Sequence, residues 1–305
     1  MSGQKMHADE IDIDGHLVGR LLAARFPQWA DLALEPVPSA GTDNAIYRLG
    51  DGMAVRLPRY PAAAEQVDRE QRWLPRLAPH LPLEIPAPLA MGSPADSYPW
   101  HWSVYRWLEG ENASIERFAD PYQAAIDLGQ FVAALQHIDR AGGPASGRGL
   151  RLADRDGSAR SAIRALRGLV DTHTAAAAWE ASLEAPAWAA PPVWTHGDLL
   201  PTNLLVVQGR LNAVIDFGGV GMGDPACDLV AAWSVFSAGT RKVFRAALGV
   251  DNATWERGRG WALSQALIIV PYYRRTNPAL VAVATRTIDE VLADHRATGA
   301  HGSAT

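Results

Sequence analysis

Apolar residues follow two different spacings in the first third of the chain. One helix is expected within residues 1–30, behind a short leader, from apolar positions at helical spacing: Leu17, Leu21, Leu22 and Phe26. Short apolar runs then alternate with turn residues, and Gly50-Asp51-Gly52 is typical of a tight hairpin. The pattern predicts five strands, at residues 34–39, 45–49, 53–57, 87–91 and 100–107.

A single helix is predicted between the third and fourth of these strands, over residues 62–77. Its inner face repeats at intervals of four and three residues: Ala63, Val67, Glu70, Leu74 and Leu77. One acid therefore interrupts an otherwise apolar stripe. Because a buried charge is costly unless it is paired, Glu70 either binds a cation or lies exposed on a tilted helix.

The rest of the chain reads as mainly helical. Residues 108–112 resemble a turn or linker, and residues 140–157 a polar loop. Strands at residues 204–207 and 212–215 are expected to flank a Gly-Arg turn, and helices are expected at residues 122–138, 158–172, 175–185 and most of 226–297. A strand-rich first third followed by helices predicts an α+β fold of two lobes with a cleft between them.

Composition narrows the classes of function. The net charge of the 305 residues is -5 and no basic run occurs, which argues against a nucleic-acid partner. The sequence has no run of about 18 apolar residues, so we expect no membrane span. The first fifteen residues lack the pattern of a secretion signal. The single cysteine, Cys227, fits a reducing compartment, so we expect a cytoplasmic protein.

The strongest chemical signal lies in residues 194–228. Phosphoryl transfer needs a group that orients and deprotonates the attacking hydroxyl, and oxygen ligands for Mg²⁺ on the nucleotide. Asp198 offers a base, Asn203 an amide oxygen five residues later, and Asp216 a carboxylate at a strand end. Each acid alone is better explained as a turn residue or a strand end, but the joint pattern with an intervening hairpin favours a functional site.

These residues resemble the catalytic and metal-binding loops of the aminoglycoside phosphotransferase family, distant relatives of the protein kinases. Kinases carry H-R-D-x-x-x-x-N and D-F-G motifs; this chain has His196-Gly197-Asp198, then Asn203, and Asp216-Phe217-Gly218. The resemblance implies a two-lobed protein-kinase-like fold. An antiparallel sheet lobe with one helix (residues 1–107) would bind nucleotide, and a larger helical lobe (residues 108–305) would hold the catalytic and substrate-binding groups.

The same resemblance implies roles for individual residues. Asp198 is the inferred catalytic base, and Asn203 and Asp216 are the inferred Mg²⁺ ligands. His196 is expected to brace the loop, and Asp228 corresponds to the buried carboxylate that holds it. We expect the Asp224-Pro225 pair to be structural as well, because it reads as a helix cap followed by proline in the first turn.

Nucleotide binding has weaker signals. The kinase lysine is replaced by Arg56, the expected partner of Glu70, and arginine can fork to phosphate oxygens. Ser39 and Thr42 lie in a loop with one glycine that either covers the phosphates or is a plain hairpin turn. Tyr105 and Trp107 stand where the family's hinge binds the base through backbone groups, although Trp107 suits core packing equally well.

The resulting hypothesis is an enzyme, a cytoplasmic O-phosphotransferase. It would move the γ-phosphoryl of ATP or GTP, with Mg²⁺, to a hydroxyl of an aminoglycoside, a macrolide or a related antibiotic. Alternatives are a catalytically silent nucleotide-binding module, a kinase for an endogenous metabolite, and a metal-dependent hydrolase using His196, Asp198 and Asp216. We expect a monomer or homodimer that binds neither nucleic acid nor membrane.

Charge does not single out a polycationic acceptor, because acids and bases nearly balance over residues 100–305. Scattered acids remain candidates for a local acidic pocket: Glu109, Glu111, Asp120, Asp127, Glu256 and Asp289. Aromatic residues offer a more apolar pocket, or simply core packing: Trp233, Trp255, Trp261, Tyr272 and Tyr273.

Overall fold

The computed structural model describes residues 10–37, 43–95 and 98–302, with side chains up to residue 298. Its contacts divide the chain into two compact units. Unit 1 comprises Met1–Gly110 with Ala213–Gly218, and unit 2 comprises Glu111–Asn212 with Gly219–Thr305. The division of nucleotide and acceptor binding between residues 1–107 and 108–305 concerns function, and it stays a prediction.

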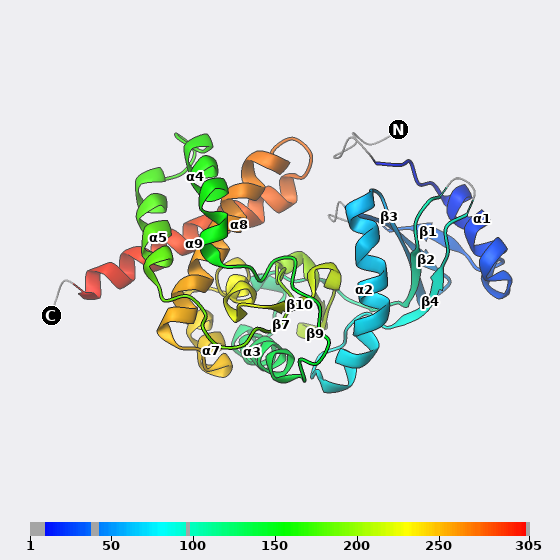
Figure 1. Cartoon of the computed structure of the whole chain (residues 1–305), viewed down its shortest axis with the longest axis horizontal. Coiled ribbons are helices and arrows are strands. Elements are labelled where there is room, and N and C mark those ends of the chain that lie inside the picture. The colour runs from blue at the N-terminus through cyan, green and yellow to red at the C-terminus, as the bar shows by residue number, and fades with distance from the viewer. Residues whose placement is uncertain (1–9, 38–42, 96–97, 303–305) are drawn as a thin grey trace. The chain divides into compact units, whose positions relative to one another are not determined.

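Unit 1 is built on an antiparallel sheet with the strand order β1-β2-β3-β5-β4 (Figure 1). The strands are β1 (Leu34–Pro36), β2 (Asn44–Leu49), β3 (Met53–Pro58), β4 (Pro88–Gly92) and β5 (Trp102–Arg106). All five predicted strands are therefore present, with shifted ends. The predicted hairpin is confirmed, because Leu49 pairs with Met53 across the turn and Gly50 adopts a φ of 55° that favours glycine.

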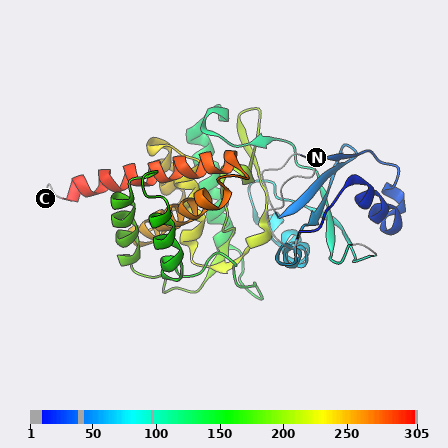
Figure 2. The same ribbon diagram turned by 90° about the horizontal axis from the view of Figure 1, so that it is seen from above.

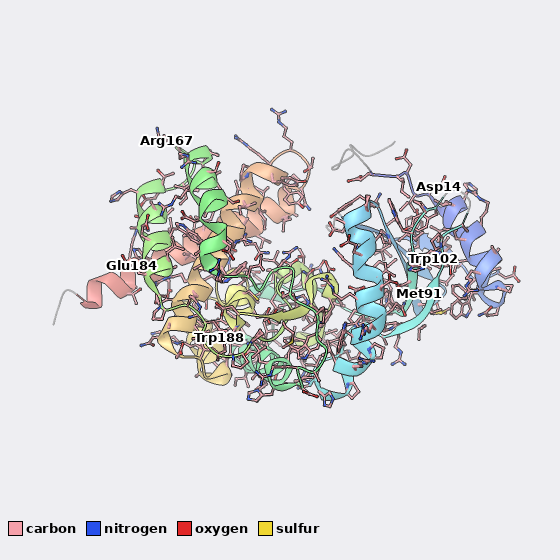
Figure 3. All side chains as sticks on the ribbon, viewed as in Figure 1. Asp14, Met91, Trp102, Arg167, Glu184 and Trp188 are labelled. Atoms are coloured by element: carbon pink, nitrogen blue, oxygen red, sulfur yellow. The ribbon has the colours of Figure 1, made fainter. Side chains whose placement is uncertain are left out.

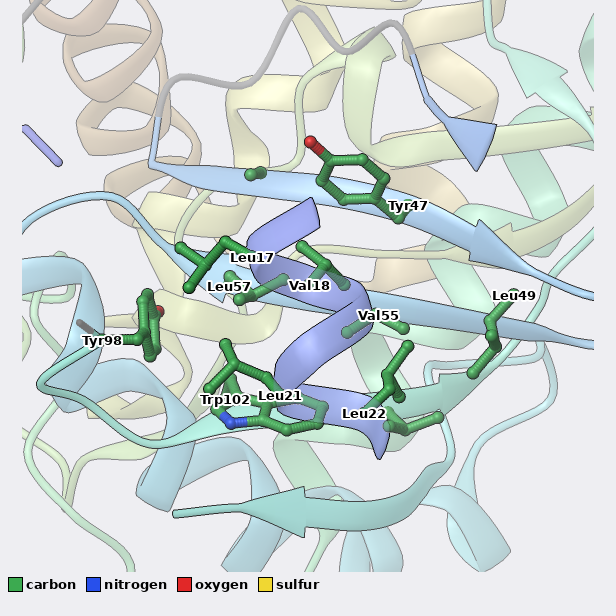
Figure 4. Close-up of a cluster of buried hydrophobic side chains, with 12 residues drawn as sticks. Leu17, Val18, Leu21, Leu22, Tyr47, Leu49, Val55, Leu57, Tyr98 and Trp102 are labelled. Carbon is green, nitrogen blue, oxygen red and sulfur yellow. The ribbon is translucent and has the colours of Figure 1, made fainter. Parts of the chain in front are cut away.

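Side chains alternate between the two faces of this sheet, as strand geometry requires. Val55 and Leu57 pack against one face, which α1 (Gly15–Arg25) covers (Figure 4). Arg56, between them, points to the opposite face, where its partner Glu70 lies on α2 (Pro61–Leu77). Figure 1 shows the two helices on opposite sides of the sheet. One strand thus contributes both to an apolar core and to a charged cluster.

The N-terminal helix α1 completes the apolar core. Asp14, labelled in Figure 3, caps it by accepting a hydrogen bond from the Leu17 backbone nitrogen at 2.8 Å. The buried members of the core come from α1, from the facing strands and from the segment before β5: Leu17, Val18, Leu21, Leu22, Ala45, Tyr47, Leu49, Val55, Leu57, Tyr98, Trp102 and Val104. The predicted helix is confirmed, and it covers one face of the sheet.

The predicted stripe on α2 is confirmed as a buried face. Ala63, Val67, Glu70, Leu74 and Leu77 are all buried, and Pro61 occupies the first turn, where its missing N–H costs nothing. Pro75 lies inside the helix, close to its last turn. The period of the apolar positions therefore predicted the correct face and nearly the correct ends of this helix.

Unit 2 is mainly helical. Its longer helices are α3 (Pro121–His137), α4 (Asp156–Ala165), α5 (Thr172–Glu184), α7 (Ala238–Leu248), α8 (Asn252–Tyr273) and α9 (Pro278–Gly302), with a short α6 (Ala231–Ser234). Most of α8 is buried, and it packs against α4, α5 and α9. The last of these, red in Figure 2, is the longest helix. Within the described residues, no helix is both long and apolar enough to span a bilayer.

Helix ends in this unit differ from the prediction, and α5 begins at Thr172 instead of residue 175. The helix expected over residues 158–172 begins earlier and stops at Ala165, because a turn follows in which Gly168 has a φ of 83°. The polar loop expected at residues 140–157 contains a short 3₁₀ turn, Leu152–Arg155, that leads into α4. Local polarity predicted the loop, but it could not show where the helix begins.

Short strands were the main omission. The three-stranded sheet has the order β6-β8-β9, with β6 (Glu111–Asn112), β8 (Leu204–Val207) and β9 (Arg210–Val214). Residues 108–112 were expected to form only a turn or linker. That expectation is wrong for Glu111 and Asn112, which form β6. The predicted Gly-Arg turn is also shifted, because Gln208 and Gly209 form it with φ angles of 49° and 77°. A further pair, β7 (Val193–Thr195) and β10 (Gly221–Gly223), was not predicted.

Candidate functional site

The loop that follows β7 is held by a buried carboxylate. Asp228 lies in a 3₁₀ segment, Pro225–Val230, and is fully buried. It accepts hydrogen bonds from the backbone nitrogens of His196, at 2.9 Å, and Gly197, at 2.6 Å. Burial raises the pKa of the Asp228 carboxyl, while the electrostatic interaction with His196 and the hydrogen bonds from the two N–H groups oppose that shift. Asp228 therefore fixes the backbone immediately before Asp198.

His196 stabilises the same loop from within. Its side chain is fully buried, and its Nδ1 accepts a hydrogen bond from the backbone nitrogen of Asp198 at 3.2 Å. Gly197 connects the two residues with a φ of 82°, which side chains larger than hydrogen rarely tolerate. The geometry of His196 matches the bracing position expected for it.

Asp198 is the centre of a group of polar contacts in unit 2. Its Oδ1 accepts hydrogen bonds from Arg148 at 2.7 Å and from Gln265 at 2.6 Å. Its Oδ2 lies 3.3 Å from Asn203 Nδ2, which also donates to the Asp198 carbonyl at 2.8 Å. The structure thus brings Asp198 and Asn203 together, and the bonds at Nδ2 direct the amide oxygen of Asn203 away from the carboxylate.

A second charged group forms in unit 1 around Arg56. Its NH1 donates to both oxygens of Glu70, at 2.8 and 2.9 Å, and its NH2 donates to Asp216 Oδ1 at 2.8 Å. Burial alone lowers the pKa of Arg56, but the charges of Glu70 and Asp216 outweigh it and raise that pKa above its ordinary value. The predicted pairing of Arg56 with Glu70 is confirmed, and the alternative of an exposed Glu70 is wrong.

Tyr105 completes this group. Its hydroxyl donates to Glu70 Oε2 at 2.5 Å, and its ring is buried. Burial and the charge of Glu70 raise the pKa of Tyr105, so the phenol remains protonated and acts as a donor. Asp216 contributes from the segment after β9 and adopts a φ of 66°, a left-handed conformation that is uncommon for aspartate and frequent at functional positions.

The other residues proposed to bind nucleotide are less defined. Trp107 donates its backbone N–H to the Gly52 carbonyl at 2.9 Å, and the guanidinium of Arg48 lies 4.8 Å from the centroid of its ring. Its indole is therefore engaged by Arg48 in unit 1. Ser39 and Thr42 lie outside the described residues.

Two polar contacts of Asp198 were not predicted. Arg148 comes from the loop before α4, and Gln265 from the middle of α8. Their separations from Asp198 along the sequence are 50 and 67 residues. The only signal was the position of Gln265 on one helical face with Trp261 and Ile268; nothing distinguished Arg148 from the other arginines of its loop.

Most of the acidic and aromatic candidates for the acceptor pocket are paired with other residues or buried in the core. Asp289 is exposed on α9. The remaining acids are engaged elsewhere: Glu109 by Arg48, Glu111 by Arg117, Glu256 by Arg259, Asp127 by Gln123, and Asp120 as the cap of α3. Trp233, Trp255 and Trp261 are buried in the core, whereas Tyr272 is 52% exposed and its ring lies 4.7 Å from that of Tyr273.

The sequence is similar to those of known phosphotransferases. The sequence profile of the phosphotransferase enzyme family matches residues 35–261, well over half of the chain. A segment of 61 residues is 41% identical to aminoglycoside 3'-phosphotransferase of Escherichia coli. It covers 20% of this chain and 22% of that relative, so this match spans about a fifth of the relative's length.

Solved structures show the fold. The GDP and kanamycin complex of APH(2")-IIIa superposes with a TM-score of 0.72 at 18% identity, covering 92% of this chain and 98% of that one. The apoenzyme of macrolide 2'-phosphotransferase MphH from Brachybacterium faecium superposes with a TM-score of 0.57 at 24% identity, covering 88% and 95%. The predicted α+β, kinase-like fold class is confirmed. By its profile over most of its length, the chain belongs to the phosphotransferase enzyme family.

Proposed function

We propose that this protein transfers the γ-phosphoryl group of ATP or GTP to a hydroxyl of a small molecule, with Asp198 as the base. The observation that carries the proposal is the loop from His196 to Asn203, in which the Asn203 amide binds Asp198 while Asp228 anchors the backbone. A loop held at both ends keeps a carboxylate in one orientation, which catalysis by positioning requires.

The two carboxylate oxygens of Asp198 have different surroundings. Oδ1 accepts two short hydrogen bonds, from Arg148 and Gln265, whereas Oδ2 has the longer contact with Asn203. Since a carboxylate oxygen can accept about two hydrogen bonds, Oδ2 has room for a further donor. We assign to Oδ2 the binding of the acceptor hydroxyl and the removal of its proton.

Oxygen donors suit the Mg²⁺ that accompanies the nucleotide. Asn203 has its amide nitrogen committed to Asp198, which leaves its oxygen as a ligand. Asp216 offers a carboxylate of which one oxygen accepts from Arg56. The two residues flank the hairpin of β8 and β9, neighbours in one sheet. We propose that both bind Mg²⁺, which when bound neutralises charge on the nucleotide phosphates.

Unit 1 carries the residues proposed for nucleotide binding. Arg56 already donates to Glu70 and Asp216, and we retain it as a candidate for phosphate binding through the charge that its guanidinium always carries. Tyr105 would act indirectly, through its bond to Glu70. We retain Ser39 and Thr42 as candidates for contacts with the phosphates, and Trp107 as a neighbour of the base. The GDP in the complex of APH(2")-IIIa supports a nucleotide as the phosphoryl donor.

The acceptor is proposed to be an antibiotic such as an aminoglycoside or a macrolide, by analogy with the proteins whose names were reported above. We further propose that the enzyme acts in the cytoplasm, as a monomer or a homodimer. The buried thiol of Cys227 is compatible with a reducing compartment.

The test is a turnover screen with ATP and GTP over hydroxyl-bearing antibiotics and metabolites, with Mg²⁺ and with EDTA. The wild-type protein should consume nucleotide with Mg²⁺ in the presence of an acceptor. Asp198→Asn should lower kcat at least about 100-fold and still fold. The matched control is Asp154→Asn, an acid of unit 2 whose partner is the exposed Arg151. Full activity in Asp198→Asn would contradict the assignment of Asp198 as the base. If the wild-type protein phosphorylated none of the acceptors, the result would support the alternative of a catalytically silent nucleotide-binding module.

A further inference from the structure

The proposed base is paired with a cation within unit 2. Arg148 NH1 lies 2.7 Å from Asp198 Oδ1, and the Arg148 side chain is 45% exposed against 15% for Asp198. The guanidinium is thus half exposed, whereas the carboxylate that it binds is mostly buried. An acceptor whose hydroxyl binds Asp198 would lie close to this positive charge.

The loop that carries Arg148 is tied to unit 2 at several points. The backbone nitrogen of Ser146 donates to the Met222 carbonyl at 3.0 Å, and that of Asp224 donates to the Gly149 carbonyl at 3.0 Å. Ser146 Oγ accepts from the backbone nitrogens of Arg148, at 3.1 Å, and Gly149, at 2.8 Å. The backbone on both sides of Arg148 is thus fixed to β10 and its continuation, which limits how far the guanidinium can withdraw.

Small residues let the side chain of Arg148 lie close to the catalytic loop. A Cβ on Gly197 would lie 3.0 Å from the Arg148 Cβ, and a Cβ on Gly219 would lie 3.8 Å from the Arg148 Cγ. The stem of Arg148 therefore runs across two glycines, one on each of the segments it packs against. This close approach directs the guanidinium to Asp198.

A second guanidinium adds positive charge to the surroundings of Asp198. Arg155 donates to Ser264, next to Gln265 on α8, and its guanidinium lies 4.8 Å from the ring centroid of Trp261. Burial, and then the charge of Arg148, lower the pKa of Arg155, so the two guanidinium groups are near enough to repel each other.

The neighbouring face of α8 is uncharged. From Gln265 it continues through Ile268 to Tyr272, whose ring is about half exposed. Gln265 can donate and accept hydrogen bonds, while Ile268 and Tyr272 offer apolar surface. This face therefore suits a compound with hydroxyl and apolar groups and no charge.

We propose that Arg148 determines specificity, favouring an acceptor whose hydroxyl is carried on an uncharged body over a polycation. The inference rests on the proposed function, because it concerns the acceptor of Asp198. An ammonium group beside the hydroxyl would be repelled by Arg148, and the Asp198 carboxylate that could attract it is already paired with that arginine. Gln265 and the face toward Tyr272 suit the hydrogen-bonding and apolar parts of an uncharged compound.

The experiment compares two ligands with the same hydroxyls, kanamycin and its per-N-acetylated form, by calorimetric binding to the full-length protein. Wild-type protein should bind the uncharged form at least about ten-fold more tightly. Arg148→Ala should reduce this preference at least about ten-fold, Arg148→Lys should keep most of it, and raising the salt concentration should weaken it. The control is Arg151→Ala, which removes a 79% exposed arginine paired with Asp154 and should leave the preference unchanged.

Three results would overturn the inference: tighter binding of kanamycin by the wild type, binding of neither compound, or the same preference in Arg148→Ala as in the wild type. Arg148→Gln serves if Arg148→Ala does not fold, and it must show the same loss. Because binding is measured without turnover, the inference can fail while Asp198 remains the base. Conversely, the Asp198→Asn test can fail while the preference for the uncharged ligand holds.

Discussion

Asp228 Oδ1 lies 2.6 Å from the backbone nitrogen of Gly197, and the same carboxylate binds the backbone nitrogen of the preceding residue. One buried side chain thus satisfies two successive N–H groups at a point where the chain turns through a left-handed glycine. The arrangement sets the direction of Asp198 without using that residue's own side chain.

Replacing Asp228 by asparagine should disturb this arrangement. The amide of the introduced asparagine would present its own N–H to one of the two backbone N–H groups, which would leave a buried donor without a partner. We expect the free energy of unfolding to fall by about 1–3 kcal/mol, together with a loss of turnover, as measured by urea denaturation and kinetics. An exposed acid of the same unit, Asp154, should tolerate the same change; equal stability of Asp228→Asn and wild type would contradict the anchoring role.

Arg56 should be essential to the stability of unit 1. Arg56→Met would leave Glu70, which is 2% exposed, as a buried acid without its cation. We expect a cost of about 3–5 kcal/mol, measured by chemical denaturation. Arg48→Met is the control, because Arg48 and Glu109 form a pair that is 35% and 66% exposed and should contribute under about 1 kcal/mol. Similar costs for the two variants would show that burial does not govern the strength of the Arg56 pair.

Gly197 should resist substitution more than glycines elsewhere. Its φ of 82° disfavours any side chain, and a Cβ there would press on the Arg148 Cβ at 3.0 Å. Gly197→Ala is expected to destabilise by at least about 1–2 kcal/mol. In contrast, Gly157 lies in α4 with nothing within 4 Å of its added Cβ, so Gly157→Ala should stabilise by up to about 1 kcal/mol. Thermal denaturation of both variants checks the contrast, and a tolerated Gly197→Ala would refute it.

Acid should weaken the N-terminus of α8. Hydrogen bonds from Thr254 lower the pKa of Asp251, which caps this helix at 2.6 Å. Since the folded pKa is depressed, the stabilisation is present above the unfolded pKa of about 4 and is lost as pH falls through the folded value. Asp251→Asn should therefore flatten the decline of stability below about pH 4. The measurement is the free energy of unfolding of wild type and variant at several pH values. The same decline below about pH 4 in both proteins would argue against this cap.

Much of the fold and part of the site followed from local sequence patterns. The period of the stripe on α2 identified its buried face, and the acid within that stripe predicted a cation, which is Arg56. The spacing between Asp198 and Asn203 correctly indicated that they belong to one loop. In each case the information lay within a few residues, or in the cost of burying an unpaired charge.

What could not be predicted depends on distant parts of the chain. Arg148 and Gln265 reach Asp198 only because a loop and a helix from other regions pack beside it. The strand β10 contains two glycines in three residues, a composition that disfavours strands; it forms because β7 is available as a partner. Gln208 at a φ of 49° is likewise tolerated by the hairpin and is not signalled by its residue type.

Of these proposals, the central one is that Asn203 and Asp216 both bind the metal ion that accompanies the nucleotide. Binding of Mn²⁺, as a paramagnetic substitute for Mg²⁺, can be followed by electron paramagnetic resonance in the presence of a non-hydrolysable ATP or GTP analogue. The account predicts that Asn203→Leu and Asp216→Asn each weaken nucleotide-dependent Mn²⁺ binding at least about ten-fold, and that the double variant loses less than the product of the two effects. Wild-type affinity in either single variant, or fully independent losses in the double variant, would contradict it.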